Sequence, residues 1–317
     1  MMSDKILTYI SLEDDQRTKI KKIAPAYDII ESTSEVADST EIKAVLGWNE
    51  DEMRELIDDT KNRLQWIQLT SAGVDYVDLN KLEKQGVTLT SASGIHENAI
   101  AESIMGMILN YTRKIGYSLI QQRQKNWSPT ENLMVTNQKT MLIVGAGSIG
   151  KQTGKVAQAF GMKTIGVNRS GEMVDYMNEL VTQNQLLDVL PKADFIVNIL
   201  PLTDETKNLF DLEKFKQMKS SAVFVNVGRG ESVVTEDLLL ALNKQFIAYA
   251  ALDVVDEEPL PESHPIFERE DVLLTPHIAG KFEGYNAAVF PIFIENLRQF
   301  KEGNTPEINK VDYEAGY

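Results

Sequence analysis

The sequence predicts an α/β protein with two domains, each built on a parallel β-sheet. Three observations indicate this fold class. Short apolar segments alternate with helix-like segments, they do so in two separate series, and the 317 residues exceed the usual size of one domain. We therefore expect two sheets, each covered by helices on both faces.

The first series precedes residue 99. Its strand candidates are the short apolar runs 6–10, 42–48, 66–70 and 87–90. Between two of them lies the polar stretch 50–63, which carries Met53, Leu56 and Ile57 at helical spacing. This spacing predicts a helix with one buried face.

The second series begins at Met141. Its strand candidates are residues 141–144, 164–168, 195–199, 222–226, 248–253 and 272–274. They are apolar and mostly β-branched, as is typical of parallel strands covered on both faces. Six such strands with helices between them match a complete dinucleotide-binding sheet.

Two long helices are predicted around the second series, over residues 98–122 and 283–301. A chain that leaves the second domain by a long helix can cross back onto the first. We therefore expect a discontinuous first domain, made of residues 1–99 and 284–317, and a second domain of residues 100–283.

Composition excludes several classes of protein. The chain has no cysteine, which excludes disulfides, thiolate nucleophiles and cysteine-ligated metals. No apolar run approaches the ~18 residues that span a bilayer, and the first residues do not resemble a secretory signal. The net charge of -15 argues against nucleic acid and anionic membranes as partners. We expect a cytoplasmic protein without a metal site, in which local positive charge attracts any anionic ligand.

A glycine-rich loop at residues 145–150 connects the predicted strand 141–144 to a predicted helix over residues 151–160. The loop has the sequence Gly-Ala-Gly-Ser-Ile-Gly. Its three glycines would permit, in order, a tight turn, approach of the backbone to a pyrophosphate, and close packing of the helix on the strand. The helix N-terminus would offer N–H groups to the anion, although such a loop can also be a simple structural turn. We predict cofactor contacts at Gly145, Gly147, Ser148, Ile149 and Gly150.

The residues after the next predicted strand bear on the choice of dinucleotide. An acidic residue there would bind the ribose hydroxyls of NAD, but this chain has Asn168, Arg169 and Ser170. Asparagine does not repel a 2′-phosphate, and Arg169 could pair with one. We expect these three residues to contact the cofactor and NADP(H) to be preferred over NAD(H); alternatively, Arg169 is an ordinary solvated arginine.

Four further motifs accompany the glycine-rich loop, in order along the chain. They are Leu-Pro-Leu-Thr at 200–203, Asn-Val-Gly-Arg-Gly at 226–230, Leu-Asp-Val-Val-Asp-Glu-Glu-Pro-Leu at 252–260, and Thr-Pro-His-Ile-Ala at 275–279. Together they resemble the D-isomer-specific 2-hydroxyacid dehydrogenase family, which includes phosphoglycerate, glyoxylate/hydroxypyruvate and formate dehydrogenases. The resemblance covers essentially the whole chain. It implies a Rossmann dinucleotide-binding domain, a flavodoxin-like substrate-binding (catalytic) domain, and hydride transfer between NAD(P)H and C2 of a small 2-keto acid or D-2-hydroxy acid.

Three residues supply the chemistry that this reaction needs. His277 is an imidazole able to give or take the proton on the substrate oxygen near neutral pH. Glu258 matches the family's acidic partner, which would hold the histidine's tautomer and favour imidazolium. Arg229 offers a planar fork that would orient the substrate carboxylate and polarise its carbonyl. Each follows a predicted strand, so we expect all three at one edge of the sheet.

The resemblance implies further contacts. The loop 71–75 follows a predicted strand, and similar family loops bind the substrate carboxylate through backbone N–H groups, here those of Ala72, Gly73 and Val74. The cofactor contacts implied by the family lie at Pro201, Val227 and Gly228, with Asp253 near the nicotinamide amide.

Four aromatic residues are given structural roles. His264 is expected to organise a turn. His96 lies near the expected crossing between domains, and we expect it to have a structural role. Trp48 and Trp127 are candidates for the substrate pocket, but packing is the role we expect of both. Residues 131–140 lack the family's usual Leu-x-Gly-Lys approach to the strand, which leaves the subfamily open.

Two alternatives are weighed against the proposed enzyme. A formate-dehydrogenase-like enzyme would typically carry Gln where Glu258 stands, so this residue argues against it. A corepressor-like NAD(P)-sensing binding protein can retain the catalytic residues, but no long disordered extension or obvious docking segment supports it. Since relatives commonly dimerise through the nucleotide domain, we also expect a homodimer.

Overall fold

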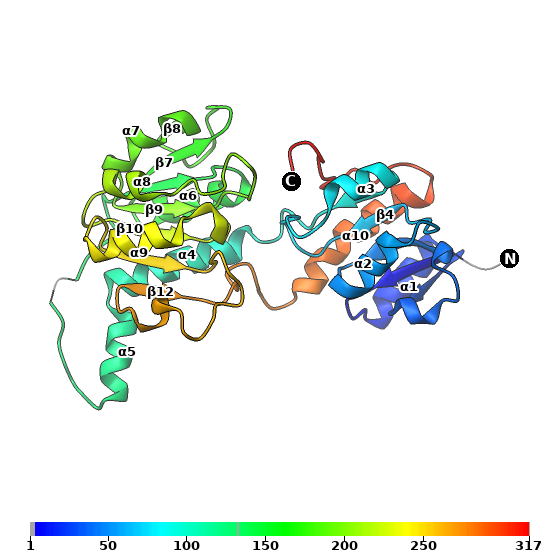
Figure 1. The fold of residues 1–317 in the computed structure, drawn as a ribbon, viewed down its shortest axis with the longest axis horizontal. Coiled ribbons are helices and arrows are strands. Elements are labelled where there is room, and N and C mark those ends of the chain that lie inside the picture. Colours follow the sequence, from blue (N-terminus) through cyan, green and yellow to red (C-terminus); the bar gives the residue numbers. More distant parts are fainter. Residues whose placement is uncertain (1–3, 132, 317) are drawn as a thin grey trace. The chain divides into compact units, whose positions relative to one another are not determined.

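The computed structural model describes residues 4–131 and 133–316, and it divides into two compact units (Figure 1). Unit 1 contains the chain up to Ile95 and again from Phe282 onward, and unit 2 is His96–Lys281. The sequence placed the crossings at 99/100 and 283/284. The first crossing comes earlier in the structure because the helix that opens unit 2 already begins at Glu97.

Unit 1 is built on a five-stranded parallel sheet with the strand order β2-β1-β3-β4-β5. The strands are β1 (Asp4–Thr8), β2 (Tyr27–Ile30), β3 (Ile42–Leu46), β4 (Trp66–Gln68) and β5 (Thr88–Thr90). This order is that of flavodoxin-like sheets, so the predicted fold class is confirmed. The edge strand β2 was missed, because a four-residue run with only one buried side chain has little hydrophobic pattern.

Helices cover both faces of this sheet. They are α1 (Asp14–Ile23), α2 (Glu50–Asp58), α3 (Leu79–Gln85) and α10 (Tyr285–Lys301). Successive residues of β1 point to opposite faces, so Leu7 packs with α2 and α3 while Ile6 packs with α1 and α10. On the second face, the Phe293 ring of α10 stacks on Trp66 at 5.2 Å. The last long helix therefore belongs to unit 1.

Unit 2 is built on a seven-stranded parallel sheet with the order β12-β11-β10-β9-β6-β7-β8. Its strands are β6 (Thr140–Val144), β7 (Lys163–Asn168), β8 (Glu179–Thr182), β9 (Phe195–Asn198), β10 (Val223–Asn226), β11 (Tyr249–Leu252) and β12 (Val272–Leu274). The six predicted strands are present, and the half-buried edge strand β8 was missed. The order reverses between β6 and β9, which is where ligands bind in sheets of this kind.

Two helical layers enclose the unit 2 sheet. The helices of this unit are α4 (Glu97–Thr112), α5 (Ile115–Arg123), α6 (Ser148–Ala159), α7 (Leu186–Val189), α8 (Leu212–Gln217) and α9 (Thr235–Asn243), and all but α5 cover the sheet. Met141 and Ile143 pack beneath α4 and α6, whereas Leu142 and Val144 pack beneath α7, α8 and α9. Short 3-10 turns lie at Thr33–Glu35, Ser39–Glu41, Gln183–Gln185, Leu190–Lys192, Gly230–Ser232 and Pro265–Glu268.

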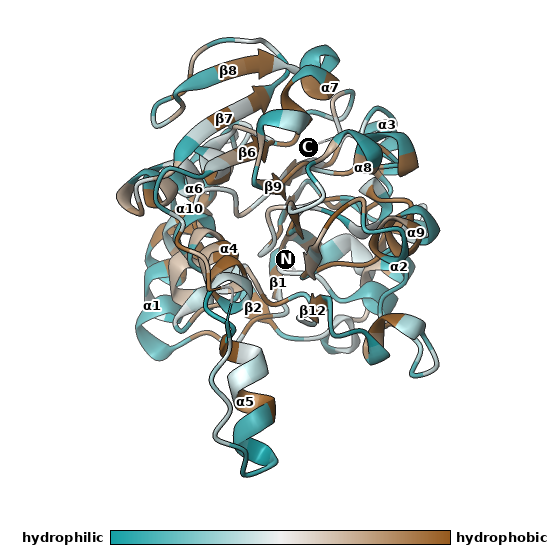
Figure 2. Cartoon of the chain, turned by 90° about the vertical axis from the view of Figure 1, so that its left-hand side faces the viewer, coloured by the Kyte–Doolittle hydropathy of each residue, from teal (hydrophilic) through white to brown (hydrophobic). Residues whose placement is uncertain are grey.

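The prediction of a single helix over residues 98–122 is wrong in one respect, because the structure has two helices there, α4 and α5. Lys114 adopts a left-handed conformation with φ 55°, which ends one helix and begins the next. The side chain of Asn110 accepts the N–H of Gly116 at 2.8 Å and so holds the bend. The α5 ribbon extends away from the sheet of its unit (Figures 1 and 2). No helix in the described ranges has the length and apolar character needed to cross a membrane.

Candidate active site

The three predicted catalytic residues follow three neighbouring strands of unit 2. Arg229 comes after β10, Glu258 after β11 and His277 after β12, and these strands pair in parallel and in register. The structure therefore brings their loops to the carboxyl edge of one sheet.

His277 and Glu258 form a direct pair. The imidazole Nδ1 lies 2.7 Å from the Glu258 carboxylate, and the other carboxylate oxygen accepts the backbone N–H of Val255 at 3.1 Å. The side chains are 53% and 36% exposed, so a small molecule in solution can reach them. Because Nδ1 is engaged by the carboxylate, Nε2 is the nitrogen placed to exchange a proton with a ligand.

Asp253 holds the loop that carries His277. Its buried carboxylate accepts the Thr275 hydroxyl at 2.6 Å and the backbone N–H groups of Ile278 and Ala279 at 2.9 Å each. Its own carbonyl accepts the N–H of His277 at 2.8 Å, and His277 adopts a left-handed φ of 52°. The family resemblance placed Asp253 near the nicotinamide. Its contacts within the chain make it an anchor for the loop that carries His277, which no sequence pattern indicated.

Arg229 is half-buried and lies in a tightly packed loop. Its Nη1 donates to the carbonyl of Gly228 at 2.8 Å. A Cβ at Gly228 would lie 2.6 Å from the carbonyl of Leu200, and one at Gly230 only 1.9 Å from the backbone of Val255. Glycine is therefore required on both sides of Arg229, and the second close approach places this loop against the segment that binds Glu258.

The glycine-rich loop fits a pyrophosphate. Gly145 has φ 108°, and a Cβ at Gly150 would lie 2.4 Å from the Gly145 carbonyl, so turn and helix can approach each other only with glycine. A Cβ at Gly147 would meet nothing within 4 Å, which leaves open space over the backbone. Ser148 and Ile149 form the first turn of α6, where helical N–H groups have no partner within the helix.

The residues after β7 form an ordered turn. Asn168 accepts the N–H of Gly171 at 2.7 Å and donates to the carbonyl of Glu172 at 3.0 Å, while the Ser170 hydroxyl accepts the N–H of Glu172 at 3.2 Å. Asn168 therefore shapes the turn that presents the exposed side chain of Arg169. The remaining predicted cofactor contacts, Val227 and Pro201, are respectively buried and exposed beside the ends of β10 and β9.

The carboxyl edge of the unit 1 sheet carries the loop predicted to bind a carboxylate. Among the described residues, the backbone N–H groups of Ala72, Gly73 and Val74 have no acceptor. We call these three groups the amide nest. The Ser71 hydroxyl contacts the Gly73 carbonyl at 2.9 Å and the Tyr76 hydroxyl at 2.6 Å, which fixes the shape of the loop.

The other singled-out aromatic residues separate into structural and exposed positions. His264 caps a 3-10 turn by accepting the N–H of Ile266, as predicted. His96 is buried at the start of α4, where burial lowers its pKa. Trp48 packs edge-on against Tyr76 at 5.6 Å. The packing role expected of Trp127 is wrong for the single chain, since this side chain is 96% exposed in the segment after α5.

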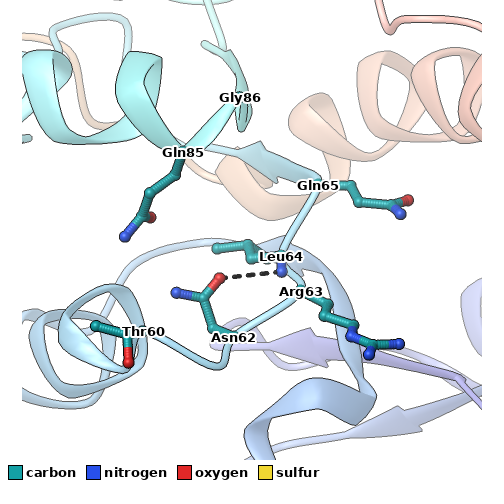
Figure 3. A pocket seen from close by; sticks show the side chains of 7 residues that line it. All are labelled: Thr60, Asn62, Arg63, Leu64, Gln65, Gln85 and Gly86. Carbon is teal, nitrogen blue, oxygen red and sulfur yellow. Dashed lines mark hydrogen bonds between the residues drawn. The ribbon is translucent and has the colours of Figure 1, made fainter.

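A polar hollow in unit 1 lies at the opposite edge of its sheet (Figure 3). Its lining comes from segments that precede β4 and β5: Thr60, Asn62, Arg63, Leu64, Gln65, Gln85 and Gly86. It holds none of the predicted site residues. Within the described part of the chain, no group of His, Asp and Glu side chains is arranged to hold a metal ion.

Comparison with known proteins agrees with this arrangement. The family model described as "D-isomer specific 2-hydroxyacid dehydrogenase, NAD binding domain" matches residues 105–279, which lie within unit 2. The chain belongs to this family. It is an NAD(P)-dependent D-2-hydroxyacid dehydrogenase.

Relatives of this dehydrogenase include two glyoxylate-reducing enzymes. The glyoxylate reductase of Aeropyrum pernix is 33% identical over 77% of this chain and 75% of its own. The mouse glyoxylate reductase/hydroxypyruvate reductase is 32% identical over 72% and 71%. Among solved structures, a D-isomer specific 2-hydroxyacid dehydrogenase family protein from Aeromonas salmonicida is 30% identical, covers 98% of this chain and 100% of its own, and has a TM-score of 0.86.

Proposed function

We propose that this dehydrogenase reduces a small 2-keto acid to the D-2-hydroxy acid, with His277 as the proton donor. The observation that carries the proposal is the 2.7 Å pair between His277 and Glu258 at the edge of the dinucleotide-binding sheet. A histidine paired with a carboxylate in this way has a fixed tautomer and orientation, which is what a general acid needs.

The other residues divide the remaining tasks. A bound nicotinamide dinucleotide would exchange hydride with C2 of the substrate. Arg229 binds the substrate carboxylate and polarises the carbonyl. Within unit 1, the amide nest offers backbone N–H donors of the kind that bind a carboxylate. His277 gives its Nε2 proton to the carbonyl oxygen during reduction and takes it back during oxidation, while Glu258 holds the imidazole by its Nδ1.

The substrate class we propose is a keto acid with a short side chain. The two relatives compared above are named for glyoxylate and hydroxypyruvate, which share a carboxylate beside a carbonyl. The groups assigned here recognise that shared part and leave the side chain unspecified. Within unit 1, Trp48 and Tyr76 would limit side-chain size near the nest.

The test is NADPH oxidation with glyoxylate, hydroxypyruvate, pyruvate and a branched keto acid, followed by chiral analysis of the product. We expect turnover of at least one of the smaller acids and a product of D configuration wherever C2 is chiral. Absence of turnover with every acid, despite tight NADPH binding, would contradict the enzymatic proposal and favour a cofactor-sensing protein.

We also propose that NADP(H) is the preferred cofactor. The turn after β7 contains no acidic side chain at the position expected to meet the ribose, and it presents Arg169 next to Asn168. A guanidinium there would pair with a 2′-phosphate, whereas a carboxylate would repel it.

Finally, we propose that the enzyme is a homodimer assembled through unit 2. Helix α5 has no buried side chain and exposes Ile115, Leu119 and Ile120, and Trp127 follows it (Figure 2). A helix with this much exposed apolar surface is expected to be covered by a partner. Light scattering across a micromolar dilution series should give twice the mass of the 35.6 kDa chain; the monomer mass throughout would contradict this proposal.

A further inference from the structure

A closed ring of buried polar groups lies directly beneath Arg229. It consists of Asn198 at the end of β9, Asn226 at the end of β10, Ser232, and the backbone carbonyl of Arg229. The three side chains are at most 1% exposed. None of these side chains was assigned a role from the sequence, although Asn226 begins the quoted motif 226–230; each ends or follows an otherwise apolar strand.

The hydrogen bonds of the ring have one consistent direction. The two N–H groups of Asn198 donate to the side-chain oxygen of Asn226 at 2.9 Å and to the Ser232 hydroxyl at 2.7 Å. Asn226 and Ser232 in turn donate to the carbonyl of Arg229, at 3.0 and 2.5 Å. Both paths therefore start at Asn198 and end on the same oxygen.

The ring uses nearly all of its hydrogen-bonding capacity within the protein. The side-chain oxygen of Asn226 also accepts the N–H of Gly228 at 3.2 Å, and that of Asn198 accepts the N–H of Leu200 at 3.3 Å. Removing one member would leave a buried donor or acceptor unsatisfied, so the remaining groups and the loop would have to move. The ring thus specifies one position for the Arg229 backbone.

A second restraint acts on the other side of Arg229. Gly230 approaches the backbone of Val255 so closely that no side chain fits between them, and the N–H of Val255 holds Glu258. The loop is thereby fixed between a buried ring and the segment that orients the acid partner of His277. Because the side chain starts from this backbone, a shift of the Arg229 carbonyl would also move the guanidinium.

We propose that Asn198 and Ser232 are positioning residues for Arg229, which set the guanidinium where it meets the substrate carboxylate and carbonyl. The inference rests on the role proposed above for Arg229. Neither residue contacts the substrate in this scheme; both act through the backbone carbonyl that they hold. A misplacement of about 1 Å by a remote change can cost roughly a hundredfold in rate, so the effect is large enough to measure.

The first experiment compares Ser232→Ala with Thr164→Val as a matched control. Thr164 is a fully buried residue of β7 in the same unit whose hydroxyl also donates to a backbone carbonyl, that of Tyr176 at 2.8 Å. We expect both variants to lower the melting temperature. Only Ser232→Ala should lower kcat/KM for the keto acid, by roughly tenfold to a hundredfold, with NADPH affinity unchanged. Wild-type kcat/KM in Ser232→Ala would overturn the inference.

A double-mutant cycle then asks whether Ser232 acts through Arg229. The readout is the affinity of the NADPH-loaded enzyme for oxamate, an unreactive 2-oxo carboxylate, so that no turnover is needed. Ser232→Ala should weaken oxamate binding about tenfold in the wild-type background and less than about twofold in Arg229→Lys, because coupled residues are not additive. An equal loss in both backgrounds would show a merely structural role and overturn the inference.

The conservative variant Ser232→Cys covers the case in which Ser232→Ala does not fold. Cysteine has a similar volume and a weak S–H donor, so its kcat/KM should be lower than that of wild type. Where Ser232→Ala does fold, the kcat/KM of Ser232→Cys should lie between the values of wild type and Ser232→Ala. Full activity would again refute positioning by the hydroxyl. The two proposals fail in different ways: wild-type kcat/KM in Arg229→Lys contradicts the role of Arg229 itself, whereas a defective Arg229→Lys with an unimpaired Ser232→Ala contradicts only the positioning.

Discussion

The carboxyl edges of the two parallel sheets present different kinds of chemical group, side chains in unit 2 and backbone N–H groups in unit 1. In unit 2 the edge presents charged or ionisable side chains, Arg229, Glu258 and His277, each in a loop fixed by buried or tightly packed groups. In unit 1 it presents a loop whose backbone N–H groups form the amide nest, and the Ser71 hydroxyl holds the shape of this loop.

The difference follows from the tasks proposed for each edge. Moving a proton and polarising a carbonyl need ionisable or charged side chains with defined positions. Binding a carboxylate needs only donors, and backbone N–H groups supply them without rotamer freedom. Unit 2 should therefore be sensitive to the identity of its side chains, and unit 1 to the presence of its backbone N–H groups.

The largest effect is expected in unit 2, from His277→Asn. Asparagine keeps a polar side chain but cannot supply an acidic proton, so kcat for keto-acid reduction should fall roughly 10²- to 10⁴-fold. Stopped-flow or steady-state NADPH oxidation measures this, with NADPH affinity as the control that should hardly change. If the variant retained more than half of the wild-type kcat while chemistry limits the rate, another group would be the donor.

The preference between NADPH and NADH should also depend on side-chain identity, in the turn after β7 of unit 2. A charge-assisted hydrogen bond contributes about 1.5–3 kcal/mol, so loss of the 2′-phosphate partner should cost roughly ten- to a hundredfold in affinity. We expect kcat/KM to favour NADPH over NADH in the wild type, and Asn168→Asp combined with Arg169→Ala to reverse the order. Equal use of both cofactors by the wild type would mean that Arg169 is only a solvated surface residue.

A pair of substitutions at Ala72 tests the other half of the comparison. Ala72→Ser keeps the backbone N–H and should leave KM for the keto acid close to that of wild type. Ala72→Pro removes the N–H, so KM should rise about tenfold, the value of a hydrogen bond to a charged group. Equal KM values in folded Ser and Pro variants would remove the nest from carboxylate binding.

The smallest effect is expected on replacing Glu258 with Gln. The carboxylate lies 2.7 Å from Nδ1 of His277 and holds the imidazole in place. Glu258→Gln keeps a hydrogen-bonding group without the charge. Because a charge-assisted hydrogen bond is stronger than a neutral one, kcat for keto-acid reduction should fall severalfold, measured by steady-state NADPH oxidation. An unchanged kcat in the folded variant would mean that the charge of Glu258 contributes nothing to the reaction.

The sequence by itself determined the fold class and the type of chemistry. Buried parallel strands are apolar over most of their length, so the runs that end at Asn198 and Asn226 are visible without a structure. A turn that meets a pyrophosphate needs glycine at fixed spacing, and Gly145, Gly147 and Gly150 follow that rule. Both signals are local, because backbone sterics and burial act within a few residues.

Only the tertiary structure decided how the loops that carry Arg229 and His277 are held. Asp253 bonds to Ile278 and Ala279, and Asn198 bonds to Ser232, across separations of 25, 26 and 34 residues. Which residues become partners depends on which strand ends are neighbours at one edge of the sheet. Local sequence patterns do not reveal that order of strands. The break at Lys114 and the exposure of Trp127 have the same origin, since a helical pattern of apolar residues does not reveal whether packing will cover them.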